Sequence, residues 1–498
     1  MEFKRSAGIL LHLASLPGSM GIGDLGKGAY RFVDWLQQAG QTWWQILPFG
    51  PLTSENQPYT SQSSWAGAYE YIDVLSLVDT GELSKKDVRG ATISDSARVN
   101  YEKTRKIKGA LLAKAAENFF NSGKSERYAE YQAFCKSEKW WLDDWAVFAA
   151  LKVANKNRAW WEWSHELSLH DEKAVNDFIH QNRELISFQK YYQFVFSSQW
   201  QKLRAYAASK GVKFIGDIPI YCARDSQDVW ANLSHFSYDS KGRQLGQAGV
   251  PPDCFSATGQ LWGGNPVYNW EVHKAEKFKW WMNRLRGSLA KTDLVRLDHF
   301  MGFQRYWDVP ANEKTAMNGS WKAGPGDEFF KAAHRTFGDA PFIAEDLGLI
   351  TEEVRNLRDH WKLPGMRVLQ FAFGGGTDNE HLPHLHNEHC IVYTGTHDND
   401  TAAGWYKSLP KKERDYFWKY AGKGSGSPVR ALMRLAYSSV ACMAIVPMQD
   451  VLELGSKARQ NLPGATVRGG NYRWKLVPKE LSAAKAKEIR EMTEAFGR

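Results

Sequence analysis

The stretch Leu294-Val295-Arg296-Leu297-Asp298-His299 joins a short apolar run to a charged motif. This is the pattern of a buried parallel strand whose last residues reach a polar surface. Two later motifs, Ala344-Glu345-Asp346-Leu347 and Thr396-His397-Asp398-Asn399, also follow apolar runs. The separations between the three motifs leave room for one or two strand–helix units. Together they predict a barrel of parallel strands with acidic residues at the strand ends.

Eight apolar runs predict the strands of this barrel, each closed by polar or glycine-containing loops. Helical patterns lie between some of them, at 30–39, 351–360 and 430–440. The alternating order predicts an α/β protein with a closed (β/α)8, or TIM, barrel. The eight runs are residues 9–13, 43–47, 214–218, 294–297, 342–344, 368–371, 391–394 and 443–446. We expect residues 1–498 to form a single catalytic barrel domain.

Two connections are longer than a simple barrel needs, and long connections of this kind form subdomains or binding surfaces. Residues 51–211, between the second and third strands, have a mostly helical pattern from Tyr101 onward and predict a helical subdomain. Residues 223–290, between the third and fourth strands, are rich in glycine, proline and aromatic residues and predict a loop region that covers a cleft. Both inserts would leave the barrel at its C-terminal face, where the carboxylates are expected.

The overall composition excludes several classes of protein. The 498 residues carry a formal net charge of +9 without a lysine/arginine block, so a nucleic-acid partner is not expected. The apolar run after Ile9 is interrupted by His12, and no stretch approaches the length of a membrane span. The five cysteines never occur in a CxxC spacing, which favours a reducing compartment. We therefore expect a cytoplasmic protein without a membrane partner.

The first two motifs suggest two carboxyl groups with opposite protonation requirements. Arg296 and Asp298 are two residues apart on a strand and project to the same face. A neighbouring guanidinium favours an ionised carboxylate, which suits Asp298 to attack an anomeric carbon. Glu345, as a general acid, must hold a proton and needs a pKa raised towards about 6–7. The adjacent Asp346 would point the other way and support the structure.

The third motif places Asp398 beside His397, an arrangement suited to hydrogen bonds with sugar hydroxyls. Each motif alone has an ordinary interpretation, because an isolated Arg-x-Asp is usually an ion pair and Thr396-His397-Asp398-Asn399 could be a turn or helix cap. Their joint occurrence at successive predicted strand ends favours glycosidic-bond chemistry. The 22 Trp, 20 Tyr and 25 Phe could supply rings that stack on sugars, although most should fill cores.

Two other clusters do not predict a cofactor. Four histidines and a glutamate in one segment match no familiar metal-ligand spacing, so we expect no metal there. Gly374-Gly375-Gly376 lacks the lysine of a phosphate-binding loop and is interpreted as a flexible barrel loop. The residues of the first cluster are His381, His384, His386, Glu388 and His389.

Longer strings around the motifs are unusual enough to indicate a family. They include Trp44-Gln45-Ile46-Leu47-Pro48, Pro58-Tyr59, Gly216-Asp217-Ile218-Pro219-Ile220-Tyr221, Gly249-Val250-Pro251-Pro252-Asp253, Thr258-Gly259-Gln260-Leu261-Trp262-Gly263, Tyr393-Thr394-Gly395-Thr396-His397-Asp398-Asn399-Asp400 and Leu435-Ala436-Tyr437-Ser438-Ser439. Over nearly the whole chain the sequence resembles the 4-alpha-glucanotransferases, the amylomaltase or disproportionating-enzyme family (glycoside hydrolase family 77). It departs from the family's usual strings at Met301, where arginine is common, and at Gly263-Gly264, where one glycine is usual.

The resemblance implies a barrel with inserted subdomains, no cofactor, an α-1,4-glucan donor and a glucan or glucose acceptor. By position it implies that Asp298 is the nucleophile, Glu345 the acid/base and Asp398 the transition-state stabiliser. The substrate-binding residues that it implies are Arg296, Asp217 and His397 around the donor sugar, Tyr59 stacking beside it, Trp262 in a loop over the cleft, and Phe371 near the acceptor side.

The expected reaction is a retaining double displacement through a covalent β-glucosyl-Asp298 intermediate. Retention predicts that the carboxyl groups of Asp298 and Glu345 lie ~5–5.5 Å apart. The alternative enzyme is an α-1,4-glucan hydrolase of the amylase type, which would use the same residues and increase the number of reducing ends. A non-catalytic glucan-binding barrel is a third interpretation, which the three carboxylates make unfavourable.

Overall fold

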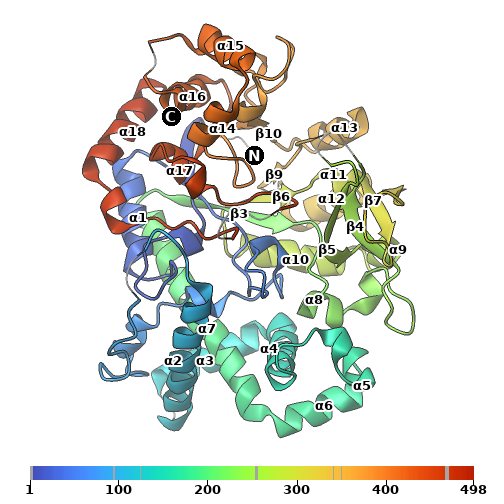
Figure 1. The fold of residues 1–498 in the computed structure, drawn as a ribbon. Coiled ribbons are helices and arrows are strands. Elements are labelled where there is room, and N and C mark those ends of the chain that lie inside the picture. Colours follow the sequence, from blue (N-terminus) through green and yellow to red (C-terminus); the bar gives the residue numbers. More distant parts are fainter. Residues whose placement is uncertain are drawn as a thin grey trace.

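The computed structural model describes residues 4–93, 96–123, 125–252, 256–339, 341–348, 350–424, 426–465 and 470–498. Asp253, the last residue of one quoted string, and Cys254 lie outside the described residues. Figure 1 shows a central barrel with helices around it and two groups of elements that extend from it.

The barrel consists of eight parallel strands in the spatial order β10-β11-β12-β1-β2-β3-β6-β9. Its two end strands meet, because the Ala344 N–H donates to the Pro364 carbonyl at 3.0 Å. This arrangement confirms the predicted (β/α)8 barrel. The strands are β1 (Ser6–Leu10), β2 (Trp43–Gln45), β3 (Lys213–Pro219), β6 (Leu294–Asp298), β9 (Phe342–Ala344), β10 (Gly365–Val368), β11 (Cys390–Tyr393) and β12 (Met443–Pro447).

Two strands lie three residues earlier in the chain than predicted. The first strand covers Ser6–Leu10 rather than 9–13, because Leu13–Ser15 turns into a 3-10 helix. Its small residues lack an apolar signal but allow close packing, since a Cβ at Gly8 would lie 2.5 Å from the Trp43 carbonyl oxygen. The strand predicted at 368–371 ends at Val368, and Leu369–Phe371 forms a 3-10 turn.

The barrel interior is filled by apolar side chains from alternate strand positions. Ile215, Leu294 and Ile343 from adjacent strands are fully buried there together with Met366 and Ile391. Burial of each such side chain contributes about 1.5–3 kcal/mol before conformational entropy is subtracted. This core holds the strand ends, and the polar residues that follow them, in fixed positions.

The helices that cover the barrel show ordinary sequence signals for their ends. In α16 (Pro428–Ser438), the Ser427 hydroxyl accepts the Arg430 N–H, and Pro428 occupies the first helical position. Its buried face includes Leu432 and Ala436. The other helices of this outer layer are α1 (Lys27–Gln38), α10 (Lys279–Leu289), α12 (Gly326–Phe337), α13 (Glu352–His360), α14 (Ala402–Ser408), α15 (Lys411–Ala421) and α18 (Ala483–Ala495), and shorter helices are α8 (Gln227–Trp230), α9 (Trp270–Ala275), α11 (Met301–Gln304) and α17 (Met448–Val451).

Among the described residues, six α-helices lie between β2 and β3, and Figure 1 shows most of them gathered on one side of the barrel. The last one, α7, packs against α2, α3 and α4 and leads back into β3. No helix in the described part of the chain is both long and apolar enough to cross a bilayer. The six are α2 (Tyr101–Asn121), α3 (Glu126–Ser137), α4 (Lys139–Ala154), α5 (His165–Ser168), α6 (Glu172–Gln181) and α7 (Arg183–Ser209).

A second, antiparallel sheet was not identified from the sequence. Its strand order is β5-β4-β7-β8, and it joins segments from both sides of β6. Gly263 and Gly264, the doubled glycine, both adopt positive φ in β5, a conformation that favours glycine. The strands are β4 (Gly246–Val250), β5 (Gln260–Pro266), β7 (Arg305–Pro310) and β8 (Ser320–Ala323).

Candidate active site

The acidic motifs meet at one end of the barrel. Asp298 is the last residue of β6, and Glu345 directly follows the neighbouring strand β9. The Glu345 N–H donates to the Leu297 carbonyl at 3.1 Å, and the Phe300 N–H donates to the Glu345 carbonyl at 3.2 Å. These backbone bonds fix the two acidic residues relative to each other. Asp398 follows β11, which β10 separates from β9 around the barrel.

Arg296 binds two carboxylates at once. Its Nη1 lies 2.8 Å from Asp298 Oδ1 and 2.8 Å from Asp217 Oδ2. Asp217 and Arg296 are register partners on β3 and β6, so both side chains point to the same side of the sheet. Burial raises the pKa of Asp217 to about 7, and the Arg296 charge opposes this shift. The guanidinium holds the Asp298 side chain in one orientation through this ion pair.

Glu345 has the environment expected of a proton donor. Removal from water raises its pKa well above the ordinary value, the Arg296 charge opposes the rise, and the Asp298 charge adds to it. The His299 N–H donates to Glu345 Oε2 at 2.7 Å, which leaves Oε1 to carry the proton. His299 adopts a φ of 51°, a left-handed conformation that is uncommon for a residue with a side chain. The Glu345 carboxyl group can therefore keep its proton above the pH at which a solvent-exposed glutamate loses it.

Asp398 is oriented by residues that the sequence analysis missed. The Asn461 Nδ2 group donates to Asp398 Oδ1 at 2.6 Å, and Arg459 donates to the Asp398 carbonyl at 2.7 Å. His397 Nε2 lies 3.2 Å from Asp398 Oδ1. Burial lowers the pKa of His397, and a carboxylate only accepts, so the neutral ring carries its proton on Nε2. Asn461 and Arg459 stand in a segment without a recognisable motif, so their spacing gave no signal.

Tyr59 connects the two halves of the site. Its hydroxyl donates to Asp217 Oδ2 at 2.6 Å. Its ring stacks on the ring of His397, with centroids 4.9 Å apart and an interplanar angle of 13°. Tyr59 therefore joins the loop after β2 to the loop after β11 and leaves an aromatic surface beside the carboxylates.

Comparison with known proteins agrees with this arrangement. The family model described as 4-alpha-glucanotransferase, glycoside hydrolase family 77, matches residues 11–480. The chain belongs to the 4-alpha-glucanotransferase family. Curated 4-alpha-glucanotransferases from Synechocystis sp. and Thermus thermophilus are each 42% identical to it, over 99% and 100% of this chain and 98% and 100% of theirs. Amylomaltase from Streptococcus agalactiae, solved in complex with acarbose, has a TM-score of 0.95 and 36% identity, covering 99% of this chain and 100% of its own.

Membership of the 4-alpha-glucanotransferase family makes the chain a glycosyltransferase that acts on α-1,4-glucans. The resemblance inferred from the sequence strings is thereby confirmed. The amylomaltase from Corynebacterium glutamicum, with a TM-score of 0.78 and 18% identity over 99% of this chain and 75% of its own, shares the fold.

Two further residues implied by the family, Trp262 and Phe371, lie outside the group of linked carboxylates. Trp262 lies in β5, a strand rather than a loop, and its ring meets the edge of His299 with centroids 4.6 Å apart. The antiparallel sheet thus reaches the backbone that binds Glu345. Phe371 is 46% exposed and packs beside His381 with centroids 5.5 Å apart. Among the described residues, the contacts that link the other site residues do not extend to Phe371.

The histidine-rich segment forms hydrogen bonds within the protein. His386 Nδ1 lies 2.7 Å from Ser439 Oγ, and its Nε2 lies 3.0 Å from the His381 carbonyl. His384 contacts the Tyr420 hydroxyl at 3.0 Å. These bonds give His386 and His384 structural roles at the end of the loop before β11.

Proposed function

We propose that the chain transfers an α-1,4-glucan segment from a donor to the 4-hydroxyl of an acceptor glucan or glucose by retaining double displacement. One arrangement supports this mechanism above all. Asp298 and Glu345 stand at the ends of adjacent strands, the first held by Arg296 and the second kept neutral by removal from water. One carboxylate and one carboxylic acid side by side are the two groups that a retaining reaction needs.

In the first displacement, an Asp298 carboxylate oxygen attacks the anomeric carbon while Glu345 gives its proton to the departing oxygen. The bond between Asp298 and the sugar forms as the glycosidic bond breaks, and the fragment with the reducing end leaves. Glu345 becomes a carboxylate, whose charge is stabilised by the His299 N–H and by the Arg296 cation. Arg296 remains paired with Asp217 after Asp298 has become an ester.

In the second displacement, Glu345 takes the proton of the acceptor 4-hydroxyl, whose oxygen attacks the anomeric carbon and releases Asp298. The α-1,4 bond is restored because two inversions have occurred. Asp398, held by Asn461 and His397, would accept hydrogen bonds from the donor sugar as its ring flattens. Tyr59 would stack beside that sugar, and Phe371 would contact the acceptor chain.

Transfer requires that a glucan acceptor reach the intermediate before water does. Residues 51–211 and 223–290 would build the groove that binds the acceptor and limits hydration. In the described part of the second insert, Trp262 reaches the site, since its ring contacts His299. Loss of this contact should shift the outcome towards hydrolysis.

The test is incubation of the pure protein with maltotriose while glucan lengths and total reducing ends are measured together. Disproportionation predicts shorter and longer glucans with a constant number of reducing ends. An increase in reducing ends without longer products would instead support an α-1,4-glucan hydrolase. The variant Glu345→Gln serves as the inactive control, because it keeps the hydrogen-bond acceptor for His299 but cannot exchange a proton.

A further inference from the structure

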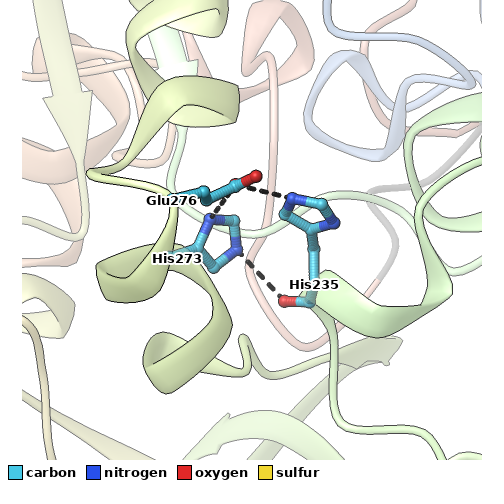
Figure 2. A group of neighbouring side chains, drawn as sticks. All are labelled: His235, His273 and Glu276. Atoms are coloured by element: carbon cyan, nitrogen blue, oxygen red, sulfur yellow. Dashed lines mark hydrogen bonds and ion pairs between the residues drawn. The ribbon is translucent and has the colours of Figure 1, made fainter.

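Two histidines and a glutamate form a compact group outside the carboxylate site (Figure 2). His235 ends the short 3-10 helix Leu233–His235, His273 lies in α9, and Glu276 directly follows α9. One possible ligand atom from each residue lies within 4.8 Å of the others. Within the described part of the chain, this is the single group of three such residues with that proximity. We call it the His–His–Glu cluster.

His273 presents an unpaired nitrogen to this cluster. Its side chain is fully buried, and its Nε2 lies 3.1 Å from the His235 carbonyl, to which it must donate. In the neutral tautomer that donates through Nε2, the Nδ1 atom has a free lone pair. Nδ1 has no hydrogen-bond partner and faces Glu276 Oε1 at 3.7 Å. A buried lone pair directed at a carboxylate is unfavourable unless a cation lies between the two.

Glu276 and His235 supply the remaining donor atoms. His235 Nε2 lies 2.6 Å from Glu276 Oε1, a hydrogen bond in which the nitrogen donates its proton. The His235 Nδ1 atom is buried without a partner. The Glu276 side chain is 30% exposed, so it can shift and admit an ion or a water molecule from solvent.

We propose that the His–His–Glu cluster binds one divalent transition-metal ion of the Zn²⁺ type. The ligands are His235 Nε2, His273 Nδ1 and the Glu276 carboxylate, and water completes a tetrahedron. The ion replaces the proton between His235 and Glu276, and His235 moves its own proton to Nδ1. Ligand atoms about 2 Å from the ion in a tetrahedron lie roughly 3.3 Å apart. The 2.6 Å distance between His235 Nε2 and Glu276 Oε1 would therefore lengthen, and the 3.7 Å distance between His273 Nδ1 and Glu276 Oε1 would shorten.

The hydrogen bond from His273 to the His235 carbonyl is the type of outer contact that metal-bound histidines make. Such a bond fixes the tautomer and the ring plane before the ion arrives. Aromatic rings surround the buried histidine, with Tyr268 at 5.3 Å and Trp280 at 5.7 Å between centroids. They exclude water from one side of the ion and leave the Glu276 side as the entry path.

The positions of the cluster residues in the chain indicate a structural role for the metal. The segment between His235 and His273 contains β4 and β5, and Trp262 lies in β5. The two ends of this segment are already joined by an isolated antiparallel bridge between Phe236 and Tyr268. A bound ion would link the same two ends of the segment and would stabilise the folded state by mass action.

The experiment uses the full chain, freed of metal with a chelator and then desalted. Titration with Zn²⁺ is followed by calorimetry, Co²⁺ binding by visible absorption, and thermal unfolding is measured with and without Zn²⁺. We expect one Zn²⁺ per chain, the intense bands of four-coordinate Co²⁺, and a higher Tm with Zn²⁺. Glu276→Gln should weaken binding by at least about tenfold and remove the Tm increase.

Two further variants test whether the loss of binding is specific to the His–His–Glu cluster. His235→Gln should reproduce the loss seen with Glu276→Gln, so the conclusion does not depend on one substitution. The matched control His360→Gln removes an exposed histidine 3.6 Å from Asp327 and should bind Zn²⁺ like the parent chain. Equal affinity in the parent and in Glu276→Gln, or the weak spectrum of six-coordinate Co²⁺, would overturn the proposal.

Discussion

The barrel mouth and the seam between β9 and β10 both join arginines to carboxylates, but in different arrangements. At the seam, Asp346 accepts the Met366 N–H at 2.6 Å and binds both Arg358 and Arg367. Two guanidiniums therefore contact one carboxylate, whose side chain is almost completely buried, and each also pairs with a more exposed one, Arg358 with Asp359 and Arg367 with Glu380. This group closes the barrel, the supporting role expected for Asp346.

At the mouth, one guanidinium serves two carboxylates, because Arg296 pairs with both Asp217 and Asp298. The Asp298 side chain remains 27% exposed. At the seam, two guanidiniums hold one buried carboxylate in place, whereas at the mouth two carboxylates share one guanidinium and Asp298 stays accessible to an incoming electrophile. The two places differ in how many guanidiniums contact each carboxylate and in how exposed that carboxylate is.

The same substitution in the two places should have opposite consequences. Asp298→Asn removes the nucleophile with little change in volume and should lower the transfer rate by about a thousandfold or more. The midpoint of thermal unfolding should change little, because Arg296 keeps its pair with Asp217. The initial rate with maltotriose and the Tm check both statements. Substantial remaining activity would show that another residue is the nucleophile.

Asp346→Asn should act mainly on stability. It leaves Arg358 and Arg367 without their shared anion, and breaking a buried pair of this kind costs about 3 kcal/mol. Denaturant unfolding measures the loss, and the kcat of the folded fraction should stay within a fewfold of the parent value. A stable but inactive variant would contradict the division between seam and mouth.

Asn461→Ala tests the support of the third carboxylate. The lost hydrogen bond to Asp398 is charge-assisted and worth about 1.5–3 kcal/mol, or roughly tenfold to a hundredfold in kcat/KM if it acts in the transition state. The control Asn118→Ala removes an exposed donor on α2 that binds the Glu82 carbonyl and should leave kcat/KM unchanged. Equal effects of the two variants would mean that Asp398 needs no positioning by Asn461.

Glu345→Gln should raise stability while it removes activity. The folded-state pKa of Glu345 lies above the ordinary value of 4.5, so the parent chain loses stability as pH rises from that value towards the folded pKa. Glutamine does not titrate, so the stability difference should grow over this window by about 1.4 kcal/mol per pKa unit. Unfolding midpoints at several pH values measure it. A difference that is independent of pH would show that Glu345 is not held neutral.

The sequence was most informative where one strand carries both an apolar run and the charged residues of the site. Strand β6 follows directly from its apolar residues, and the two-residue spacing correctly placed Arg296 and Asp298 on one face. The antiparallel sheet was missed because β5 contains Gly263 and Gly264, and β8 is exposed throughout. Such strands have neither an apolar run nor a regular alternation.

Long-range contacts explain what the motifs could not reveal about the site. Asn461 and Tyr59 reach the carboxylates from distant loops, and only the fold brings these side chains together. The resemblance to a family supplied Tyr59, whereas no quoted string contained Asn461. The pKa of Glu345 also depends on Arg296 and Asp298 from a neighbouring strand, so it follows from the packing.

The most direct test of the mechanism is to trap the covalent intermediate in Glu345→Gln. With α-maltotriosyl fluoride as donor, the first displacement needs no proton, while the second lacks its base and should be slow. Mass spectrometry of the digested protein should then find the maltotriosyl group on the peptide that contains Asp298. An adduct on another residue, or fluoride release that yields an inverted product without an adduct, would contradict the account.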